Sequence, residues 1–452
     1  MTQLGEAIAR YHKLLESDRY KDLEWAESLR SRMQEQHLTT GGRAVSPALR
    51  PHFITRRQYT NLVKAAESLM GAIDRIKQMA LANPSLLARM ELLPAEKMLA
   101  SLDPGYPYLA VTSLLDTHIN NGTLHFTDYN AEAPAGVVYG EALTDLFYEA
   151  APIKEFRKRY KLSKLGGTKQ FLQALLKAYR EFGGKKVPNI AIVEFRQPYQ
   201  PSDASEYLLL CEYFKQHGYP TEVVSPDQLE YRNGILRRGD FIIDLVYRRV
   251  KAQEFLVRFD LSHPLVRAYR DGAVCIVNSF RSELAQKKAI FDLLTDETIT
   301  ANFPPNERKA IREYVPWTRV VASTKTTYRD QSVDLPEFIL KNRETLVLKP
   351  NDDSSDQHSF RGWEIDDSGW ERALKTAMRS PYVVQERIKP ISEPFPIYRY
   401  GTLEVREMNI DVHPHAFLGK VHGASTWLSP AGSVGFSTLS GLAPTFVLES
   451  GK

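Results

Sequence analysis

Cysteine is scarce in this chain, and long apolar runs are missing. Cys211 and Cys275 are the two cysteines among 452 residues, and neither has a neighbouring Cys or His at metal-ligand spacing. We therefore expect buried thiols in a reducing compartment, not a disulfide or a zinc site. No stretch approaches the ~18 apolar residues of a membrane helix, and residues 1–10 lack an apolar signal core. These absences favour a soluble, cytoplasmic protein.

An excess of charge is also missing. Lys and Arg together number 59 and Asp and Glu number 55, so the formal net charge is +4. Nucleic-acid-binding proteins carry clustered basic residues, and this balance gives no support to a nucleic-acid partner. The histidines are scattered, and no Ser/His/Asp or Cys/His set stands out as a nucleophilic centre.

The length and the changing patterns predict several domains. Residues 1–100 are expected to be helical, because apolar residues recur at spacings of three and four: Leu62, Ala65, Leu69, Ile73 and Ile76. Residues 101–186 combine a hairpin with helices. Residues 187–280 alternate strands and helices, as in a small open-sheet domain. Residues 281–452 open with a helix over 284–294 and continue mainly as strands.

The segment 108–129 predicts a β-hairpin around an Asn-Gly turn, and its acidic end is a candidate metal site. Asp128 and Asn130 are two apart on a strand, so their side chains share a face. Glu132 is a third member if the strand continues. Carboxylate and amide oxygens suit Mg²⁺. The alternative is an ordinary half-exposed hairpin whose polar side chains are simply solvated.

Asp116 joins that face only in one register of the hairpin. A two-residue loop pairs Asp116 with Thr127 and places it on the face opposite Asp128. A three-residue loop pairs Asp116 with Phe126 and places both carboxylates on the same face. The metal site therefore requires the longer loop, which is usually a type I turn with a bulge.

Two lysines on separate elements are candidates for binding phosphate. Lys349 ends the apolar strand 345–349, and Lys288 begins an apolar helix. Lysines act at phosphate sites as point charges. The loop after Lys349 has no glycine before Gly362, which is unlike a phosphate-cradling loop. Lysines at such positions can also simply be exposed.

The strand 382–388 is a candidate adenosine site. It alternates apolar residues with Gln385, its backbone can face an adenine edge, and Glu386 can reach a ribose. A plain core strand is the alternative. Arg406, on a strand over 402–412, is a candidate for holding the γ-phosphate or an acyl phosphate.

Taken together, these motifs resemble those of the circularly permuted ATP-grasp proteins, which include the glutathionylspermidine synthase-like enzymes. The resemblance runs from about residue 100 to 448 and rests on five segments in the family's order: 126–136, 243–249, 278–289, 347–350 and 382–390. Unpermuted relatives place the lysines before the acidic-x-Asn motif, whereas here Asp128-Tyr129-Asn130 comes first.

The resemblance implies a role for each matched residue. It implies that Asp116, Asp128 and Asn130 hold Mg²⁺ and that Lys288 and Lys349 contact the ATP phosphates. It implies that Gln385, Glu386 and Ile388 surround the adenosine. Lys288, Lys349 and Arg406 would offset developing charge during catalysis. Arg248 and Arg249 would face a carboxylate substrate, or would be solvated arginines of an edge strand.

We therefore expect an α/β (α+β mixed) protein with a permuted ATP-grasp body, an inserted open-sheet domain like that preceding the ATP-binding part in relatives, and a helical N-terminal region. The leading hypothesis is an ATP- and Mg²⁺-dependent carboxylate–amine ligase that uses an acyl phosphate and acts on small-molecule or peptide substrates. A binding module without turnover is the alternative, and a phosphotransferase is a third possibility. Leu114 stands where the synthase-like enzymes have an arginine, and Asp128 where a glutamate is usual.

Overall fold

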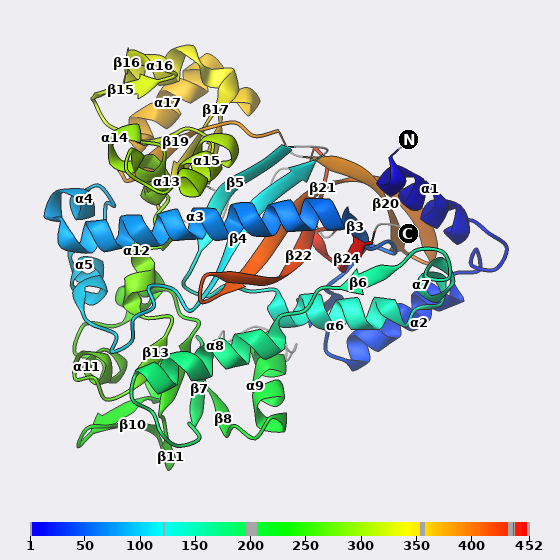
Figure 1. The fold of residues 1–452 in the computed structure, drawn as a ribbon, viewed down its shortest axis with the longest axis horizontal. Helices are drawn as coiled ribbons and strands as arrows, with labels where there is room; N and C mark the ends of the chain where they lie inside the picture. The colour runs from blue at the N-terminus through cyan, green and yellow to red at the C-terminus, as the bar shows by residue number, and fades with distance from the viewer. Residues whose placement is uncertain are drawn as a thin grey trace.

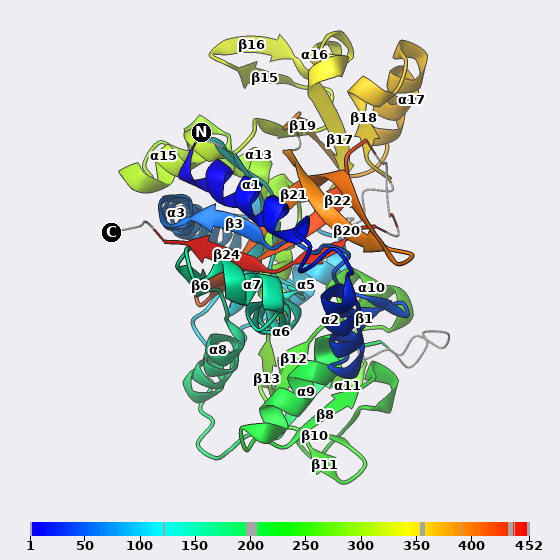
Figure 2. The same ribbon diagram turned by 90° about the vertical axis from the view of Figure 1, so that its right-hand side faces the viewer.

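A large antiparallel sheet forms the centre of the computed structural model (Figures 1 and 2), which describes residues 2–120, 123–195, 206–352, 358–389, 391–432, 437 and 439–449. Its strand order is β23-β22-β21-β4-β5, and β20 also pairs with β21. The strands are β4 (Thr112–Asn120), β5 (Thr123–Asn130), β20 (Ser392–Arg399), β21 (Thr402–Phe417), β22 (Lys420–Pro430) and β23 (Gly441–Ala443). The last third of the chain thus joins the early hairpin β4–β5 in one sheet.

The long helix α3 (Arg56–Ala82) covers one face of this sheet (Figure 1). Thr55 and Gln58 form a capping box at its start. Its buried face, which includes the apolar residues predicted from their spacing, packs against the inward side chains of the sheet in one core. Each fully buried Leu or Ile contributes about 1.5–3 kcal/mol. Polar side chains of the sheet are therefore left to its other face.

The remaining N-terminal elements lie near the two ends of α3: those that precede α3 are on the right of Figure 1, and the two short helices that follow it are on the left. They are α1 (Gln3–Leu15), α2 (Glu24–Glu35), β1 (Thr39–Thr40), β2 (Arg43–Ala44), β3 (His52–Thr55), α4 (Pro84–Ala88) and α5 (Pro94–Ser101). β3 pairs in parallel with the C-terminal strand β24 (Thr445–Leu448), which also pairs with β6 (Leu162–Lys164). The first hundred residues are thus tied to the end of the chain by a strand.

A four-stranded parallel sheet lies below the central sheet in Figure 1. Its order is β13-β12-β7-β8, with β7 (Ile190–Val193), β8 (Thr221–Val224), β12 (Leu245–Arg248) and β13 (Cys275–Val277). Helices α8 (Thr168–Glu181) and α9 (Glu206–Gln216) share one core with it, and α10 (Ala252–Arg258) and α11 (Pro264–Arg270) share the core on its other face. Cys211 and Cys275 are both buried and form no disulfide, and burial raises the pKa of both thiols.

Smaller elements complete this part of the chain. Helices α6 (Val137–Tyr148) and α7 (Ala151–Phe156) connect it to the hairpin β4–β5. An Asn233-Gly234 turn joins β9 (Glu230–Arg232) to β10 (Ile235–Arg238), and β11 (Phe241–Ile242) pairs with β10. Both turn residues have positive φ, as the Asn-Gly pair predicts.

A second antiparallel sheet stands above the central sheet at the upper left of Figure 1. Its order is β14-β19-β17-β18, with β14 (Thr318–Val320), β17 (Leu346–Pro350), β18 (Phe360–Arg361) and β19 (Tyr382–Glu386). Helices α16 (Leu335–Lys341) and α17 (Asp367–Ala377) share its core, whose largest buried side chain is Trp370. The hairpin β15 (Lys325–Tyr328)–β16 (Gln331–Asp334) lies beside α16.

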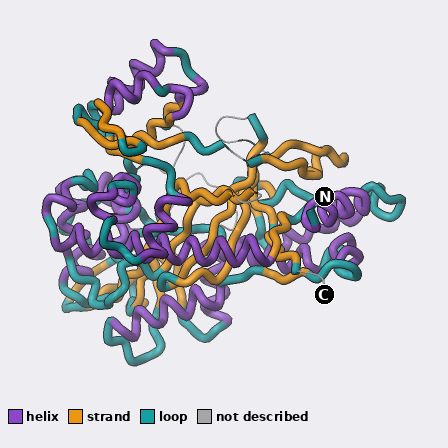
Figure 3. Tube along the Cα trace, turned by 45° about the horizontal axis from the view of Figure 1, so that its top comes forward, coloured by secondary structure: helices purple, strands orange, loops and turns teal. Residues whose placement is uncertain are grey.

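The helix expected over 284–294 is divided in two. Helices α12 (Glu283–Gln286) and α13 (Ala289–Leu294) are separated by Lys287, whose backbone is extended with ψ 128°. The helices α14 (Glu297–Thr300) and α15 (Pro305–Tyr314) follow, and α15 packs against α3. Figure 3 shows the strands lying between helices on either side. No helix in the described part of the chain is long and apolar enough to cross a membrane.

Candidate functional site

The predicted metal ligands gather on the face of the central sheet that α3 leaves open. Asp116 lies directly opposite Asp128, and Leu114 lies opposite Asn130, so the three polar side chains share one face. The route to this register differs from the expectation. Asn120 pairs with Thr123, as in a two-residue loop, and the register shifts at a bulge between Asp116 and Thr117. The Asn121-Gly122 turn itself lies outside the described residues.

Glu132 does not belong to this group. β5 ends at Asn130, whose side-chain Oδ1 accepts a hydrogen bond from the Glu132 backbone N–H at 3.2 Å. The Glu132 carboxylate is buried and instead accepts from Arg248 Nη1 at 2.8 Å and from the backbone N–H of Ala252 at 2.9 Å. The chain turns after β5, which removes Glu132 from the polar face.

The neighbouring strand β21 adds two residues that the sequence analysis did not select. His413 Nε2 lies 3.4 Å from Asp116 Oδ1, and His118 Nδ1 lies 2.7 Å from Asp411 Oδ1. Asp411 and His413 are two apart, so they point to the same side of β21. The signal that could have found them is the alternation of Asn409, Asp411 and His413 with the apolar Met408, Ile410 and Val412.

The pKa values of Asp116 and Asp411 are shifted in opposite directions. Burial raises the pKa of Asp116; the charges of His413 and Lys349 oppose the rise, and those of Asp128 and Asp411 add to it. Burial also raises the pKa of Asp411, but the His118 hydrogen bond and the charges of His118, His413 and Lys349 outweigh it and leave that pKa lowered. The charge of Lys349 acts to lower the pKa of both carboxylates.

Both predicted lysines reach the polar face. Lys288 is the residue before α13, is buried to 7% exposure, and places its Nζ 3.0 Å from Asp128 Oδ2. Lys349 comes from β17 in the other sheet, and its Nζ donates to Gln385 Oε1 at 2.9 Å. Lys288 is thus paired with a predicted metal ligand, and Lys349, 61 positions later in the sequence, acts through its charge on the neighbouring carboxylates of Asp116 and Asp411.

Asn351 fixes the two lysine-bearing elements to each other. Its backbone carbonyl accepts from Lys288 N at 2.8 Å, and its Oδ1 accepts from Ala289 N at 2.9 Å. Its Nδ2 donates to the carbonyl of Met90 at 3.1 Å, and its side chain is buried. The chain two residues after Lys349 is therefore bonded to the first residues of α13. Sequence reasoning missed this role because the partners are distant in the sequence.

A buried ion cluster supports the same junction. Lys287 Nζ lies 2.9 Å from Glu96, 2.8 Å from Asp352 and 3.2 Å from Glu283. Burial alone lowers the pKa of Lys287, but the surrounding carboxylates raise it above its ordinary value. Burial raises the pKa of Glu283 well above its ordinary value, and the nearby Glu132 charge adds to the effect. Lys287 is thus a structural cation.

Gln385 and Glu386, which we expect near an adenosine, point to opposite sides of β19. Gln385 is buried and links Lys349 to Thr318 Oγ1. Glu386 points to the other side of β19, where it accepts from Tyr328 Oη at 2.7 Å. β19 pairs with β14 on one side and β17 on the other, so its backbone is used within the sheet. The backbone of 382–386 is therefore engaged within the sheet, and contacts of Gln385, Glu386 and Ile388 with an adenosine stay a prediction.

The three candidate arginines occupy unlike surroundings. Arg406 is half-exposed and binds Glu404, and it lies seven residues before His413 on β21, roughly 20 Å at 3.3 Å per residue. The structure does not bring it to the lysines. Arg248 is fully buried, and its guanidinium donates hydrogen bonds to Glu132, Val250, Asn278, Ser279 and Ser282. It is therefore neither a solvated arginine nor one that faces a substrate.

Arg249 remains at the carboxyl end of β12. Its Nε donates to Glu194 Oε2 at 3.0 Å, and its Nη1 is buried without a hydrogen-bond partner in the part of the chain that is described. Burial lowers the pKa of Arg249, but Tyr247, Glu206 and Glu194 raise it above its ordinary value. It therefore stays charged.

Comparison with solved structures shows a known fold at remote sequence identity. A glutathione synthetase-like effector from Globodera pallida, in its apo form, gives a TM-score of 0.63 at 13% identity, covering 94% of this chain and 97% of that one. A putative gamma-glutamylcysteine synthetase from Methylobacillus flagellatus KT gives 0.42 at 10% identity over 87% of each chain. The ATP-grasp ligase PsnB, complexed with a minimal precursor, gives 0.29 at 11% identity over 58% of this chain and 90% of that one.

Only the first of these three likenesses is strong enough to use, and it shows the fold alone. It confirms the expected α/β class, in a fold shared with a glutathione synthetase-like protein. No family model and no curated protein sequence matches the chain.

Proposed function

We propose that this protein is an ATP- and Mg²⁺-dependent carboxylate–amine ligase. The observation that carries the proposal is the convergence of Lys288 and Lys349, from two elements, on the sheet face that holds Asp116 and Asp128. Lysines suit phosphate oxygens and carboxylates suit the accompanying metal. The fold shared with a glutathione synthetase-like effector supports the same class.

We also propose that the chain is a circularly permuted ATP-grasp protein. The hairpin β4–β5, which carries the acidic residues, precedes β17, which carries Lys349, and in the proposed site the two act together. This order is the one that the sequence motifs favour.

The acidic face fits Mg²⁺ by the chemistry of its donors. Asp116, Asp128 and Asn130 supply hard oxygens from one side of the hairpin. Within the described ranges no three His, Cys, Asp or Glu side chains are placed to hold a metal together. A site of one or two carboxylates completed by nucleotide phosphates is usual for Mg²⁺. When held by Asp116, Asp128 and Asn130, the ion would offset the negative charge of the phosphates.

Each lysine has a defined part in the proposed reaction. Lys288, which contacts Asp128 at 3.0 Å, would exchange this contact for a phosphate oxygen and leave Asp128 to the metal. Lys349, held by Gln385, would meet the phosphates from the other sheet. Both cations would stabilise charge that develops as the γ-phosphoryl group moves. Ile388 and its neighbours after β19 would contact the adenosine.

The reaction would have two steps. An oxygen of the substrate carboxylate attacks the γ-phosphorus, the bond to the β-phosphate oxygen breaks, and ADP leaves. The amine nitrogen then attacks the carbonyl carbon of the acyl phosphate. The amine loses a proton, inorganic phosphate leaves, and an amide remains.

Arg249 is the proposed contact for a substrate carboxylate. It lies at the carboxyl edge of the parallel sheet, between β7 and β12, where connections leave in opposite directions. Ligands of open parallel sheets commonly bind at such a switch point. Arg248 is excluded from this role because its hydrogen bonds are made within the core.

One observation favours the alternative of a binding module without turnover. Leu114 is buried opposite Asn130 on the metal-binding hairpin, at the position where an arginine is expected in active relatives. Arg406 does not replace that arginine, because it lies along β21 beyond reach.

Release of ADP distinguishes these two proposals. The protein is incubated with Mg²⁺-ATP and with panels of carboxylic acids and amines, and ADP is measured. A ligase releases ADP only when both an acid and an amine are present, and Lys349→Ala abolishes the release. Nucleotide binding without ADP release from any pair would favour the binding module.

A further inference from the structure

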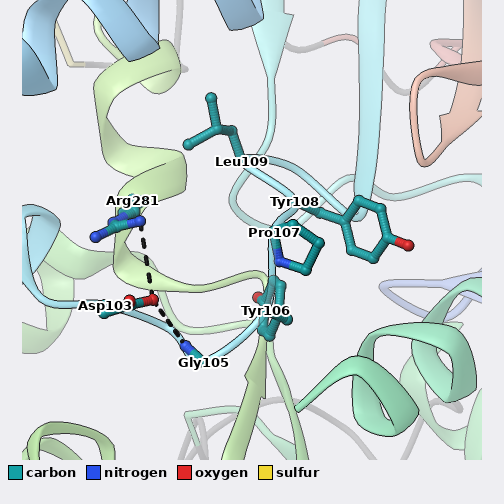
Figure 4. A pocket seen from close by; sticks show the side chains of 7 residues that line it. All are labelled: Asp103, Gly105, Tyr106, Pro107, Tyr108, Leu109 and Arg281. Carbon is teal, nitrogen blue, oxygen red and sulfur yellow. Dashed lines mark hydrogen bonds and ion pairs between the residues drawn. The ribbon is translucent and has the colours of Figure 1, made fainter.

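A cavity of about 440 Å³ lies away from the polar face, lined by Asp103, Arg281 and the loop 105–109 (Figure 4). It lies beyond the carboxyl end of β13, a usual place for ligands of parallel sheets. Its wall is fixed by hydrogen bonds, because Tyr106 Oη donates to the Ile276 carbonyl at 2.7 Å.

The other side of the cavity is anchored as well. Ser279 N donates to Tyr106 Oη at 3.1 Å, and Asn278 Oδ1 accepts from Val111 N at 2.8 Å. The loop before β4 is thus bonded to the segment that carries Arg281. Tyr106 is held in place before any ligand arrives, which lowers the cost of binding.

Arg281 is poorly compensated in this position. Its side chain is 22% exposed, and across the described ranges it makes no hydrogen bond to the protein; its Nε is buried without an acceptor. Its ion pair is with Asp103, at the long distance of 4.0 Å. A guanidinium with unmet donors is costly to bury. A ligand carboxylate is the group that matches its fork of donors.

Asp103 supplies the opposite charge at the mouth of the same cavity. Its Oδ1 accepts from Gly105 N at 3.0 Å, which sets its orientation (Figure 4). Its side chain is 81% exposed. A carboxylate and a guanidinium 4.0 Å apart match the ammonium and carboxylate that an α-amino acid carries on one carbon atom.

We propose that this cavity binds a free α-amino acid with an apolar side chain. Its carboxylate contacts Arg281, its ammonium contacts Asp103, and its side chain packs against Pro107, Tyr108 and Leu109. The inference does not depend on the nucleotide site, because binding here requires no ATP. An amino acid is also a substrate class that a carboxylate–amine ligase can use as acid or as amine.

Binding is tested by saturation-transfer NMR and calorimetry without nucleotide, using three probes. L-leucine carries both charges, N-acetyl-L-leucine lacks the ammonium, and L-leucinamide lacks the carboxylate. We expect saturable binding of L-leucine and at least about a tenfold loss of affinity for each of the other two.

Variants connect the charges to the residues. Arg281→Gln is expected to abolish discrimination between L-leucine and L-leucinamide, and Asp103→Asn to abolish discrimination between L-leucine and N-acetyl-L-leucine. Arg232→Gln, which removes an exposed arginine near Glu230, is the control and leaves all three affinities unchanged. Absence of saturable L-leucine binding to the folded wild type at millimolar concentration overturns the proposal. Equal binding of all three probes, or discrimination that survives in both variants, does the same.

Discussion

Single residues of the same type have different roles here because their partners differ. Arg248 and Arg249 are adjacent on one strand, yet the first is enclosed by Glu132 and backbone carbonyls and the second ends at the sheet edge. Strand alternation predicts that neighbours point to opposite sides. Alternation does not predict which of the two side chains is buried, since Glu132, the partner of Arg248, lies more than a hundred residues earlier.

The enclosed arginine should be a stability residue. Arg248→Met leaves the buried Glu132 carboxylate without its cation, and breaking a buried pair in this way costs about 3–5 kcal/mol. Urea denaturation measures the loss. The matched control is Arg406→Ala, whose half-exposed pair with Glu404 predicts a change within about 0.5 kcal/mol. Equal stability of the two variants would contradict the interior role of Arg248.

At the scale of elements, the sequence predicts whether a segment is a helix or a strand better than it predicts the contacts between elements. The hairpin β4–β5 and the apolar strand before Lys349 follow from alternation and turn residues. The bulge between Asp116 and Thr117 does not, because neither alternation nor the turn residues specify where an extra residue enters the hairpin. The break between α12 and α13 depends on three carboxylates that surround Lys287. Such tertiary contacts override local propensity.

The Asn351 join should affect nucleotide affinity as well as stability. Asn351→Ala removes the side-chain bonds to Ala289 N and the Met90 carbonyl, so the two lysines lose their fixed separation. Leaving these buried groups unpaired costs about 1–3 kcal/mol of stability, and we expect weaker Mg²⁺-ATP binding by about tenfold. Calorimetry on the folded variant measures the affinity.

Asn342→Ala is the comparison for that variant. Asn342 bonds a carbonyl at the end of α16 in the same sheet region but joins no lysine-bearing elements. Its removal should leave nucleotide affinity unchanged. An Asn351 variant that binds Mg²⁺-ATP as tightly as the Asn342 variant would show that the join does not set the lysine geometry.

For the whole molecule, the α/β class could be predicted from alternating patterns, and the shared fold confirms it. The connection between the two ends of the chain could not, because β3 and β24 pair across nearly the full sequence. Periodicity reports which face of a strand is buried but not which distant strand lies beside it. For the same reason, periodicity does not show that Asp411 and His413 lie beside the hairpin β4–β5.

The pairing of the chain ends should make stability depend on pH. The hydrogen bond from Arg56 lowers the pKa of Glu449 to about 2, from an ordinary value of 4.5. A carboxylate with a lowered pKa stabilises the fold above its unfolded pKa, and the contribution is lost as the pH falls from about 4.5 towards 2. Glu449→Gln should therefore lower stability at pH 7 by up to about 1 kcal/mol.

Urea titrations at pH 7 and pH 3 measure this difference. The gap between the wild type and Glu449→Gln should narrow at the lower pH, because at pH 3 the Glu449 carboxylate of the unfolded chain has taken up a proton while that of the folded chain is still mostly charged. A gap that stays constant or widens on acidification would contradict the role of the Arg56–Glu449 pair.

The most direct test of the central claim is calorimetry of ATP binding with Mg²⁺. The wild type is compared with Lys349→Ala and Asp128→Ala, and with Arg406→Ala as a control away from the site. Mg²⁺-dependent binding that the first two variants weaken by more than about 1.4 kcal/mol, a factor of ten, and that the control leaves unchanged, is the predicted result. Absence of nucleotide binding by the folded wild type would contradict the ligase proposal.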